Sequence, residues 1–138
     1  MDPLAFREYL REFNAANYDA FARYYAEDVF LSFSHGPTLR GRDAVVAFYR
    51  PMHECVKETV EIQFLVMDAR HVAAELAAEF HALRDFDLFT RGPLRAGDVV
   101  RLTSFVHYDL DSSGRFRQIR VGSYGAGVAG VKEDAAGS

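Results

Sequence analysis

Hydrophobic residues near the start of the chain recur at the spacing of a helix. Between Phe6 and Phe13 they fall at i, i+3, i+4 and i+7, which places them on one helical face. Asp2 offers an N-cap acceptor, and Pro3 follows it at a position where its missing N–H costs nothing. This pattern predicts an amphipathic helix at the N-terminus.

Two further helices are expected in the next forty or so residues. One is capped by Asn17 and ends near Asp28, with aromatic residues at helical spacing: Phe21, Tyr24 and Tyr25. The other follows Gly41, and its apolar positions are Val45, Phe48, Tyr49 and Met52. Pro51 removes a backbone donor and crowds the preceding turn, so the third helix is predicted to be short or bent.

Later in the chain the hydrophobic period changes to alternation, which indicates strands. A short apolar run at residues 29–33 predicts a first, buried strand. Two alternating strands then flank a turn at residues 68–70. Their apolar faces are Val60, Ile62, Phe64 and Val66 in the first strand, and Val72, Ala74, Leu76, Ala78 and Phe80 in the second. Residues 99–110 and 115–124 predict a final hairpin around the turn 111–114.

This order of elements predicts an α+β domain in which a curved antiparallel sheet wraps around three N-terminal helices. The domain is expected to span residues 1–124, and the Gly- and Ala-rich residues 125–138 are expected to be a flexible tail. Residues 84–98 show no period. Long loops of this kind are uncommon in compact domains, so a lid over a binding site and ordinary surface packing both stay open.

The composition and charge of the chain argue against several classes of function. The chain has 138 residues and a formal charge of −4, with Lys and Arg scattered singly, so no basic stripe exists for nucleic acid. No apolar stretch reaches membrane-spanning length, and the N-terminus lacks a signal-peptide pattern, so a cytoplasmic protein is expected. Cys55 is the only cysteine, which excludes paired-thiolate metal sites. Aromatic residues make up 14% without any Trp, an excess that indicates a pocket.

Three stretches of the chain carry a family resemblance. The segment 9–17 with Phe21, the run Tyr25-Ala26-Glu27-Asp28-Val29, and Gly36 through residues 41–49 resemble the front half of the nuclear transport factor 2 superfamily. The similarity is greatest to its SnoaL-like branch of polyketide cyclases, with ketosteroid isomerase as a more distant relative. The hairpin of residues 108–121 is similar to the family's last hairpin. The resemblance implies a cystatin-like cone, and cone-shaped domains of this kind host many activities.

The resemblance to ketosteroid isomerase implies a role for Tyr9, which falls where that family has its oxyanion-stabilising tyrosine. The family's general-base Asp falls on Phe33 and its protonated Asp on Val106, so steroid isomerisation by that mechanism is not expected. The epoxide-hydrolase branch needs an Arg between two carboxylates. The nearest pattern, Arg101 with Thr103, lacks them.

We expect the inner surface of the cone to form a ligand pocket. An apolar wall with a few phenols suits a small lipophilic, oxygen-bearing molecule. The expected lining is Phe13, Tyr24, Tyr25, Phe33, Phe48, Tyr49, Met52, Leu76, Phe80, Ser104, Val106 and Tyr108. Tyr9, His35 and His53 are the candidate catalytic residues, because a phenol can polarise a carbonyl and a histidine can move a proton near neutrality. Core tyrosines and solvated histidines are the alternative interpretation.

Alternation places a dense set of titratable residues on the outer face of the sheet: Glu61, Glu75, Glu79, His81, Arg101 and His107. We expect this face to be solvated or to form a homodimer interface. A register shift of one residue would instead turn the same side chains inward.

The sequence thus predicts a SnoaL-like pocket protein acting on a small lipophilic oxygenated molecule. Acid–base chemistry by an isomerase, cyclase or dehydratase would need no metal and no cofactor. The alternatives are a non-catalytic ligand-binding module and a dimerisation module of the same fold. A pocket histidine within reach of Tyr9 favours the enzyme, whereas a pocket plugged by Phe33 and Phe80 favours the module.

Overall fold

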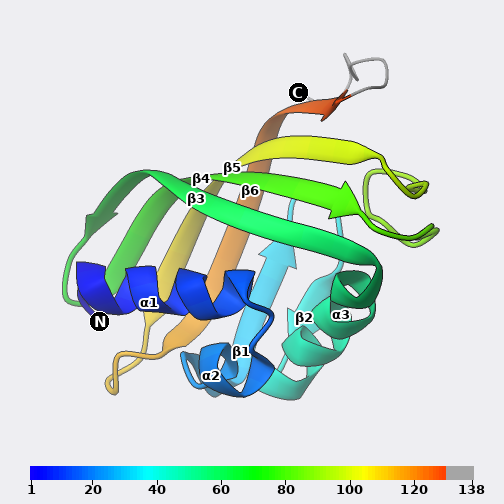
Figure 1. Ribbon diagram of the computed structural model, residues 1–138. Coiled ribbons are helices and arrows are strands. Elements are labelled where there is room, and N and C mark those ends of the chain that lie inside the picture. Colours follow the sequence, from blue (N-terminus) through cyan, green and yellow to red (C-terminus); the bar gives the residue numbers. More distant parts are fainter. Residues whose placement is uncertain (130–138) are drawn as a thin grey trace.

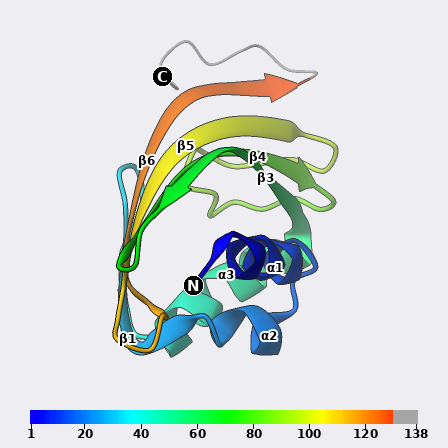
Figure 2. The same ribbon diagram turned by 90° about the vertical axis from the view of Figure 1, so that its left-hand side faces the viewer.

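The computed structural model describes the backbone of residues 1–129 and the side chains of residues 1–124. Within that part, three helices and six strands follow one another as α1 (Pro3–Asn14), α2 (Tyr18–Ala22), β1 (Tyr25–Phe33), β2 (Thr38–Arg40), α3 (Arg42–Cys55), β3 (Val56–Met67), β4 (His71–Ala82), β5 (Val99–Leu110) and β6 (Phe116–Ala129). The sheet order is β2-β1-β6-β5-β4-β3. Figure 1 shows the helices gathered on one face of the sheet, and Figure 2 shows the long strands arching over them. The predicted α+β cone is confirmed.

Helix α1 forms as its sequence predicts. The Asp2 carboxylate accepts a hydrogen bond from the backbone N–H of Ala5 at 2.8 Å, and Pro3 occupies the first turn. The residues at helical spacing are all buried: Phe6, Tyr9, Leu10 and Phe13. This face packs the helix against the concave side of the sheet.

The next two helices differ from the prediction. Helix α2 ends at Ala22, and Tyr25 already belongs to β1, where it pairs with Phe116 and its carbonyl accepts from the Arg42 guanidinium. Strand pairing therefore overrides the helical spacing of Tyr24 and Tyr25. Helix α3 is longer than expected and continues through Pro51 to Cys55. Burial of Met52 at 6% exposure holds the last turn in place despite the missing donor.

Strand β3 contains an irregularity that changes which side chains face inward. Its register against β4 shifts between Ile62 and Phe64, so Leu65 and Met67 pack on the core while Phe64 and Val66 face solvent. The predicted inward placement of Phe64 and Val66 is wrong for this reason. The inward face predicted for β4 is confirmed by the burial of Val72, Ala74, Leu76 and Phe80.

Strand β6 also differs in two respects. It pairs in parallel with β1, so the sheet is not wholly antiparallel. It also continues past Tyr124, where the sequence predicts a tail, and residues 126–129 pair with the start of β5. The Gly and Ala residues of this stretch can pair because a strand ladder uses backbone groups, and β5 supplies the partners. Residues 130–138 of the predicted tail lie outside the described residues.

Two buried clusters fill the cone. The larger joins α1, the start of β1 and the concave faces of the long strands, with Phe6, Phe21 and Phe116 fully buried at its centre. The smaller lies at the other end and joins α3 to the segment 84–98 through Met52, Phe80 and Phe89. A bridge between Phe86 and Leu94 folds that segment on itself. None of the described helices is long and apolar enough to cross a membrane.

Candidate functional site

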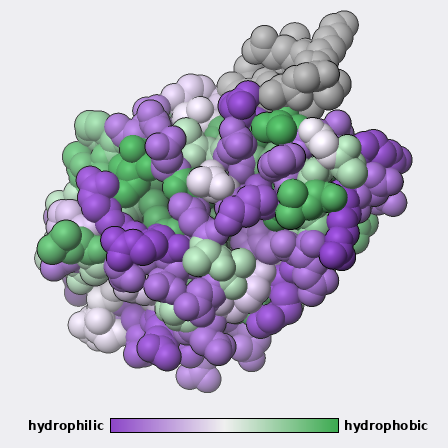
Figure 3. All heavy atoms as spheres, viewed as in Figure 1, coloured by the Kyte–Doolittle hydropathy of each residue, from purple (hydrophilic) through white to green (hydrophobic). Residues whose placement is uncertain are grey.

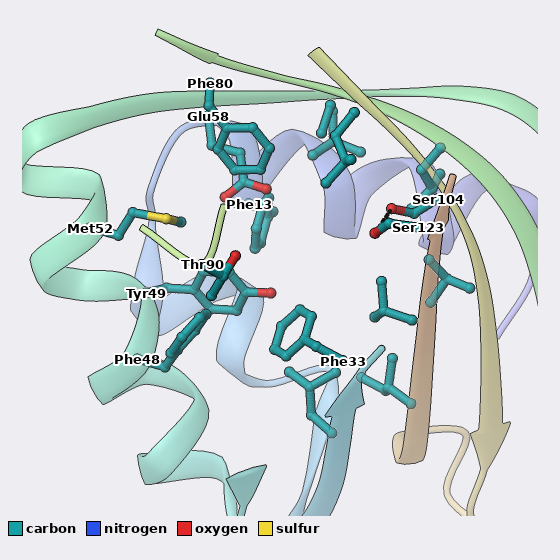
Figure 4. Close-up of a pocket in the computed structure, with 18 of the residues that line it drawn as sticks. Phe13, Phe33, Phe48, Tyr49, Met52, Glu58, Phe80, Thr90, Ser104 and Ser123 are labelled. Atoms are coloured by element: carbon teal, nitrogen blue, oxygen red, sulfur yellow. Dashed lines mark hydrogen bonds between the residues drawn. The ribbon is translucent and has the colours of Figure 1, made fainter. Parts of the chain in front are cut away.

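A cavity of about 400 Å³ lies between the helices and the concave face of the sheet. Its wall is mostly apolar, and Figure 4 shows aromatic side chains from both layers pointing into it. The expected residues found in the lining are Tyr9, Phe13, Tyr25, Phe33, His35, Phe48, Tyr49, Met52, Leu76, Phe80, Ser104, Val106 and Tyr108. Phe86, Leu88 and Phe89 show that the segment 84–98 also lines it. The volume suits a small organic ligand.

Tyr24 does not line the cavity. Its ring lies against Tyr9 and Phe116, with centroids 5.5 and 6.5 Å away, on the other side of these two rings. Tyr24 lies in the turn before β1, and only Tyr25, the first residue of the strand, reaches the cavity.

A buried glutamate stands in the cavity wall. Glu58 lies near the start of β3 with 8% of its side chain exposed, beside Phe80 of β4, its register partner. Burial raises the pKa of the Glu58 carboxyl, and the hydrogen bond and charge of His53 oppose that shift. The sequence analysis does not single out Glu58. Extending the alternation of Val60 and Ile62 backwards by two residues places it on the inner face.

His53 lies behind Glu58 and does not line the cavity itself. Its Nε2 is 3.0 Å from Glu58 Oε1, and its Nδ1 is 3.0 Å from the Tyr18 hydroxyl. With neutral His53, Tyr18 donates to Nδ1 and Nε2–H donates to the carboxylate, so the two partners select one tautomer. The ring of Tyr49 stacks on the imidazole with centroids 5.4 Å apart. His53 is therefore held as a support for Glu58.

Four cavity tyrosines stay protonated. Burial raises the pKa of Tyr9, Tyr25, Tyr49 and Tyr108 well above the usual phenol value. The charge of Glu58 adds to the shift at Tyr9, Tyr25 and Tyr49. The Tyr9 and Tyr25 hydroxyls are 2.8 Å apart, so one hydrogen joins them and the other is left to donate. The phenols are donors, and Glu58 is the group beside them that can exchange a proton.

His35 lies at the rim. It is exposed in the turn between β1 and β2, and it contributes to the cavity lining at a distance from the buried pair of His53 and Glu58. The structure thus separates the two candidate histidines, one at the mouth and one behind the wall.

One group of residues on the outer face has the composition of a metal site. Among the described residues, His71, His107 and Asp109 bring one ligand atom each within 4.8 Å of one another. Arg120 donates to His107 Nδ1 at 2.8 Å and to Asp109 Oδ2 at 3.2 Å. A donor at Nδ1 leaves the proton of neutral His107 on Nε2, the nitrogen that a metal would need. The geometry fits an ion-pair network better than a metal centre.

The sheet curves over the helices and encloses an apolar cavity. The protein is therefore of the class of cone-shaped domains with an internal pocket. The family model described as the SnoaL-like domain matches residues 6–119, which is most of the chain. The chain belongs to this family, within the nuclear transport factor 2 superfamily, and the predicted resemblance is confirmed. No curated protein matches the chain.

Solved structures share the fold over most of their length. A candidate polyketide cyclase from Xanthomonas campestris is 22% identical, with a TM-score of 0.71 and 85% of each chain covered. SalBIII, an epoxide hydrolase/cyclase-like enzyme of pyran ring formation in salinomycin, is 21% identical, with a TM-score of 0.69, covering 86% of this chain and 87% of its own. A Mycobacterium tuberculosis protein in complex with an estradiol hemisuccinate is 16% identical, with a TM-score of 0.68 and 86% and 89% covered. At these identities the likeness shows the fold alone.

Proposed function

We propose that this protein is a cofactor-independent acid–base enzyme, an isomerase, cyclase or dehydratase, acting on a small lipophilic molecule that carries a carbonyl group. The observation that carries the proposal is Glu58, a carboxyl buried in an apolar cavity wall with its own histidine partner. Perturbed carboxyls with a specific partner in a cavity are typical of catalytic sites. Cyclases and a steroid complex among proteins of the same fold agree with this substrate class.

The first chemical step assigned to Glu58 is proton abstraction. The carboxylate takes a proton from the carbon beside the substrate carbonyl, and the C–H electron pair moves into an enolate. A neutral phenol of the Tyr9–Tyr25 pair or of Tyr49 donates to the enolate oxygen. Burial makes ionised Glu58 a stronger base, and His53 keeps its carboxylate oriented.

The second step decides the product class. Where a C=C bond is conjugated with the enolate, Glu58 returns the proton to the far carbon of the dienolate, and the double bond moves to give an isomer. Attack of the enolate carbon on a second carbonyl of the same molecule closes a ring and leaves an alkoxide, which takes the proton from Glu58. Loss of the new hydroxyl as water, with a second proton from the carbon beside the first carbonyl, gives a dehydrated product. Each path uses only the proton carried by Glu58 and the atoms of the substrate.

Hydrogen exchange tests the first step without knowledge of the product. Purified protein is incubated in D₂O with a panel of lipophilic ketones and diketones, and deuterium at the carbon beside the carbonyl is followed by mass spectrometry. We expect Glu58→Gln to slow the exchange about 100-fold or more. The matched control is Glu79→Gln on the outer face, which should exchange at the wild-type rate. Wild-type exchange no faster than that of Glu58→Gln would contradict the proposal.

A non-catalytic ligand-binding module is the second candidate. It is favoured by Phe33 and Val106, apolar lining residues at the positions where the related isomerase carries its two carboxyls. In that case the panel would bind, as judged by native mass spectrometry, and no ketone would exchange deuterium.

We also propose that two copies pair through the outer face of the sheet. Phe64, Val66, Phe105 and Tyr124 stand on that face with 58, 50, 56 and 40% of their surface exposed, more apolar area than a solvated sheet needs. Figure 3 shows hydrophobic residues gathered over the end of the sheet formed by β3 and β4. We expect Phe105→Asp to give a monomer in sedimentation velocity, whereas Leu4→Asp on α1 should leave a dimer. A wild-type monomer would contradict the proposal.

A further inference from the structure

The cavity wall contains a second polar site, formed by two serines. Ser104 of β5 and Ser123 of β6 face each other across the ladder, and their hydroxyl oxygens are 3.0 Å apart. Figure 4 shows the two serines on the opposite side of the cavity from Glu58 and Tyr49, with apolar side chains between. Their neighbours on the same strand faces are Leu102, Val106 and Val121, all in the apolar lining.

Packing alone does not account for two serines here. Ser104 is 9% exposed in a wall where an aliphatic residue would bury more apolar area. The hydrogen-bond count is also incomplete. Two hydroxyls bring two hydrogens, and the bond between them uses one. The Ser34 hydroxyl accepts from the backbone N–H of Ser123 at 3.2 Å, not from its side chain. Among the described residues, neither serine hydroxyl makes a further hydrogen bond, and both serines line the cavity, so the second hydrogen is available to a ligand.

We infer that Ser104 and Ser123 form a subsite that binds a neutral oxygen, a hydroxyl or ketone, at the end of the ligand remote from the reacting carbonyl. This deepens the proposed function, on which it rests only in taking the cavity as the ligand site. The pair gives one donor and several lone pairs without charge, so it matches a neutral oxygen better than a carboxylate. The substrate class is then a lipophilic molecule with an oxygen function at each end.

The contact between the ligand oxygen and the serines is measured by comparing the affinities of three ligands for three forms of the protein. The probes are testosterone, its analogue without the ring-D hydroxyl, and its analogue without the ring-A ketone oxygen. Each is titrated by calorimetry into wild type, Ser104→Ala/Ser123→Ala and Thr103→Ala. The last variant removes a hydroxyl from the same strand but outside the cavity lining, so it is the matched control. Two analogues are needed because either end of the steroid can reach the serines.

The double serine variant should bind testosterone about tenfold more weakly, the effect of one lost hydrogen bond. It should bind one of the two analogues, the one lacking the oxygen at the serine end, with unchanged affinity. Thr103→Ala should bind all three as wild type does. An equal loss for all three probes, no loss for any, or no binding to wild type would overturn the inference. The titrations are repeated in a Glu58→Gln background, which separates the two proposals. The serine substitutions should weaken testosterone binding there too, whether or not deuterium exchange identifies Glu58 as a base.

Discussion

The two faces of the sheet use the same kinds of ionisable side chain in opposite ways. On the concave side, Glu58 of β3 and His53 of α3 form one pair with 8% and 5% of their side chains exposed. On the convex face, Glu79 and Arg101 form a pair at 3.1 Å with 47% and 63% exposed, and His107, Asp109 and Arg120 form a network at the other end of β5. Water screens the outer charges, whereas the inner carboxyl depends on a single partner. The number of titratable groups therefore says little about where chemistry takes place.

The largest expected difference between the buried and the exposed pair is the loss in the free energy of unfolding when one partner of each pair is removed. His53→Leu keeps apolar volume but leaves the buried Glu58 carboxyl and the Tyr18 hydroxyl without their partner, so the free energy of unfolding should fall by about 2 kcal/mol. Arg101→Leu breaks the exposed pair and should change it by about 0.5 kcal/mol or less. Urea denaturation followed by circular dichroism measures both. Equal losses in the two variants would show that burial does not distinguish the pairs.

A smaller difference is expected for tyrosine hydroxyls on the two faces. Tyr9→Phe leaves the buried Tyr25 hydroxyl without its 2.8 Å partner and should lower the free energy of unfolding by about 1 kcal/mol. In the Phe105→Asp variant, which is expected to be monomeric, Tyr124→Phe removes a hydroxyl that donates to Glu75 on the exposed face, and it should leave the denaturation midpoint unchanged. A larger shift for Tyr124→Phe than for Tyr9→Phe would reverse the comparison.

Sequence predicts most of the fold because its strongest patterns are local. The buried positions of α1, the inward face of β4 and the hairpin of β5 and β6 follow directly from periodicity and turn residues. The errors arise where a distant partner decides. Tyr25 leaves the helical pattern because Phe116 pairs with it, and a bulge in β3 turns Phe64 outward. Neither partner is visible in the local spacing.

The candidate site was predictable in outline and incomplete in its chemistry. Alternation and family resemblance place most of the aromatic lining in the cavity, yet the resemblance draws attention away from Glu58. The related isomerase carries its carboxyls at the positions of Phe33 and Val106, so an alignment finds no acid there. In this chain a carboxyl enters the same cavity from the start of β3. A cavity wall is shared by several elements, and a functional group can come from any of them.

The smallest expected difference is between the buried Glu58 carboxyl and a surface carboxyl, Asp111, in the dependence of stability on pH. Burial raises the pKa of Glu58, so as pH rises the unfolded chain loses this proton first. Stability should then fall as pH rises from the ordinary Glu value of about 4.3 through the raised one. Asp111, in the turn before β6, has its pKa lowered, first by the hydrogen bond from Ser113 and then by the backbone N–H groups of Arg115 and Ser113. Its contribution is present above about 3.9 and is lost as pH falls through the lowered pKa.

Differences in melting temperature between wild type and each amide variant isolate the two effects. The stability of wild type relative to Glu58→Gln should decline as pH rises above about 4.3 and become constant beyond the raised pKa. Relative to Asp111→Asn it should be constant near neutrality and decline as pH falls below about 3.9. The two differences thus slope in opposite directions because one carboxyl is buried and the other accepts hydrogen bonds at the surface. A slope of the same sign as that of Asp111 would mean that the His53 contact outweighs burial and lowers the pKa of Glu58. No slope would mean that Glu58 is solvated and has the ordinary pKa of a surface carboxyl.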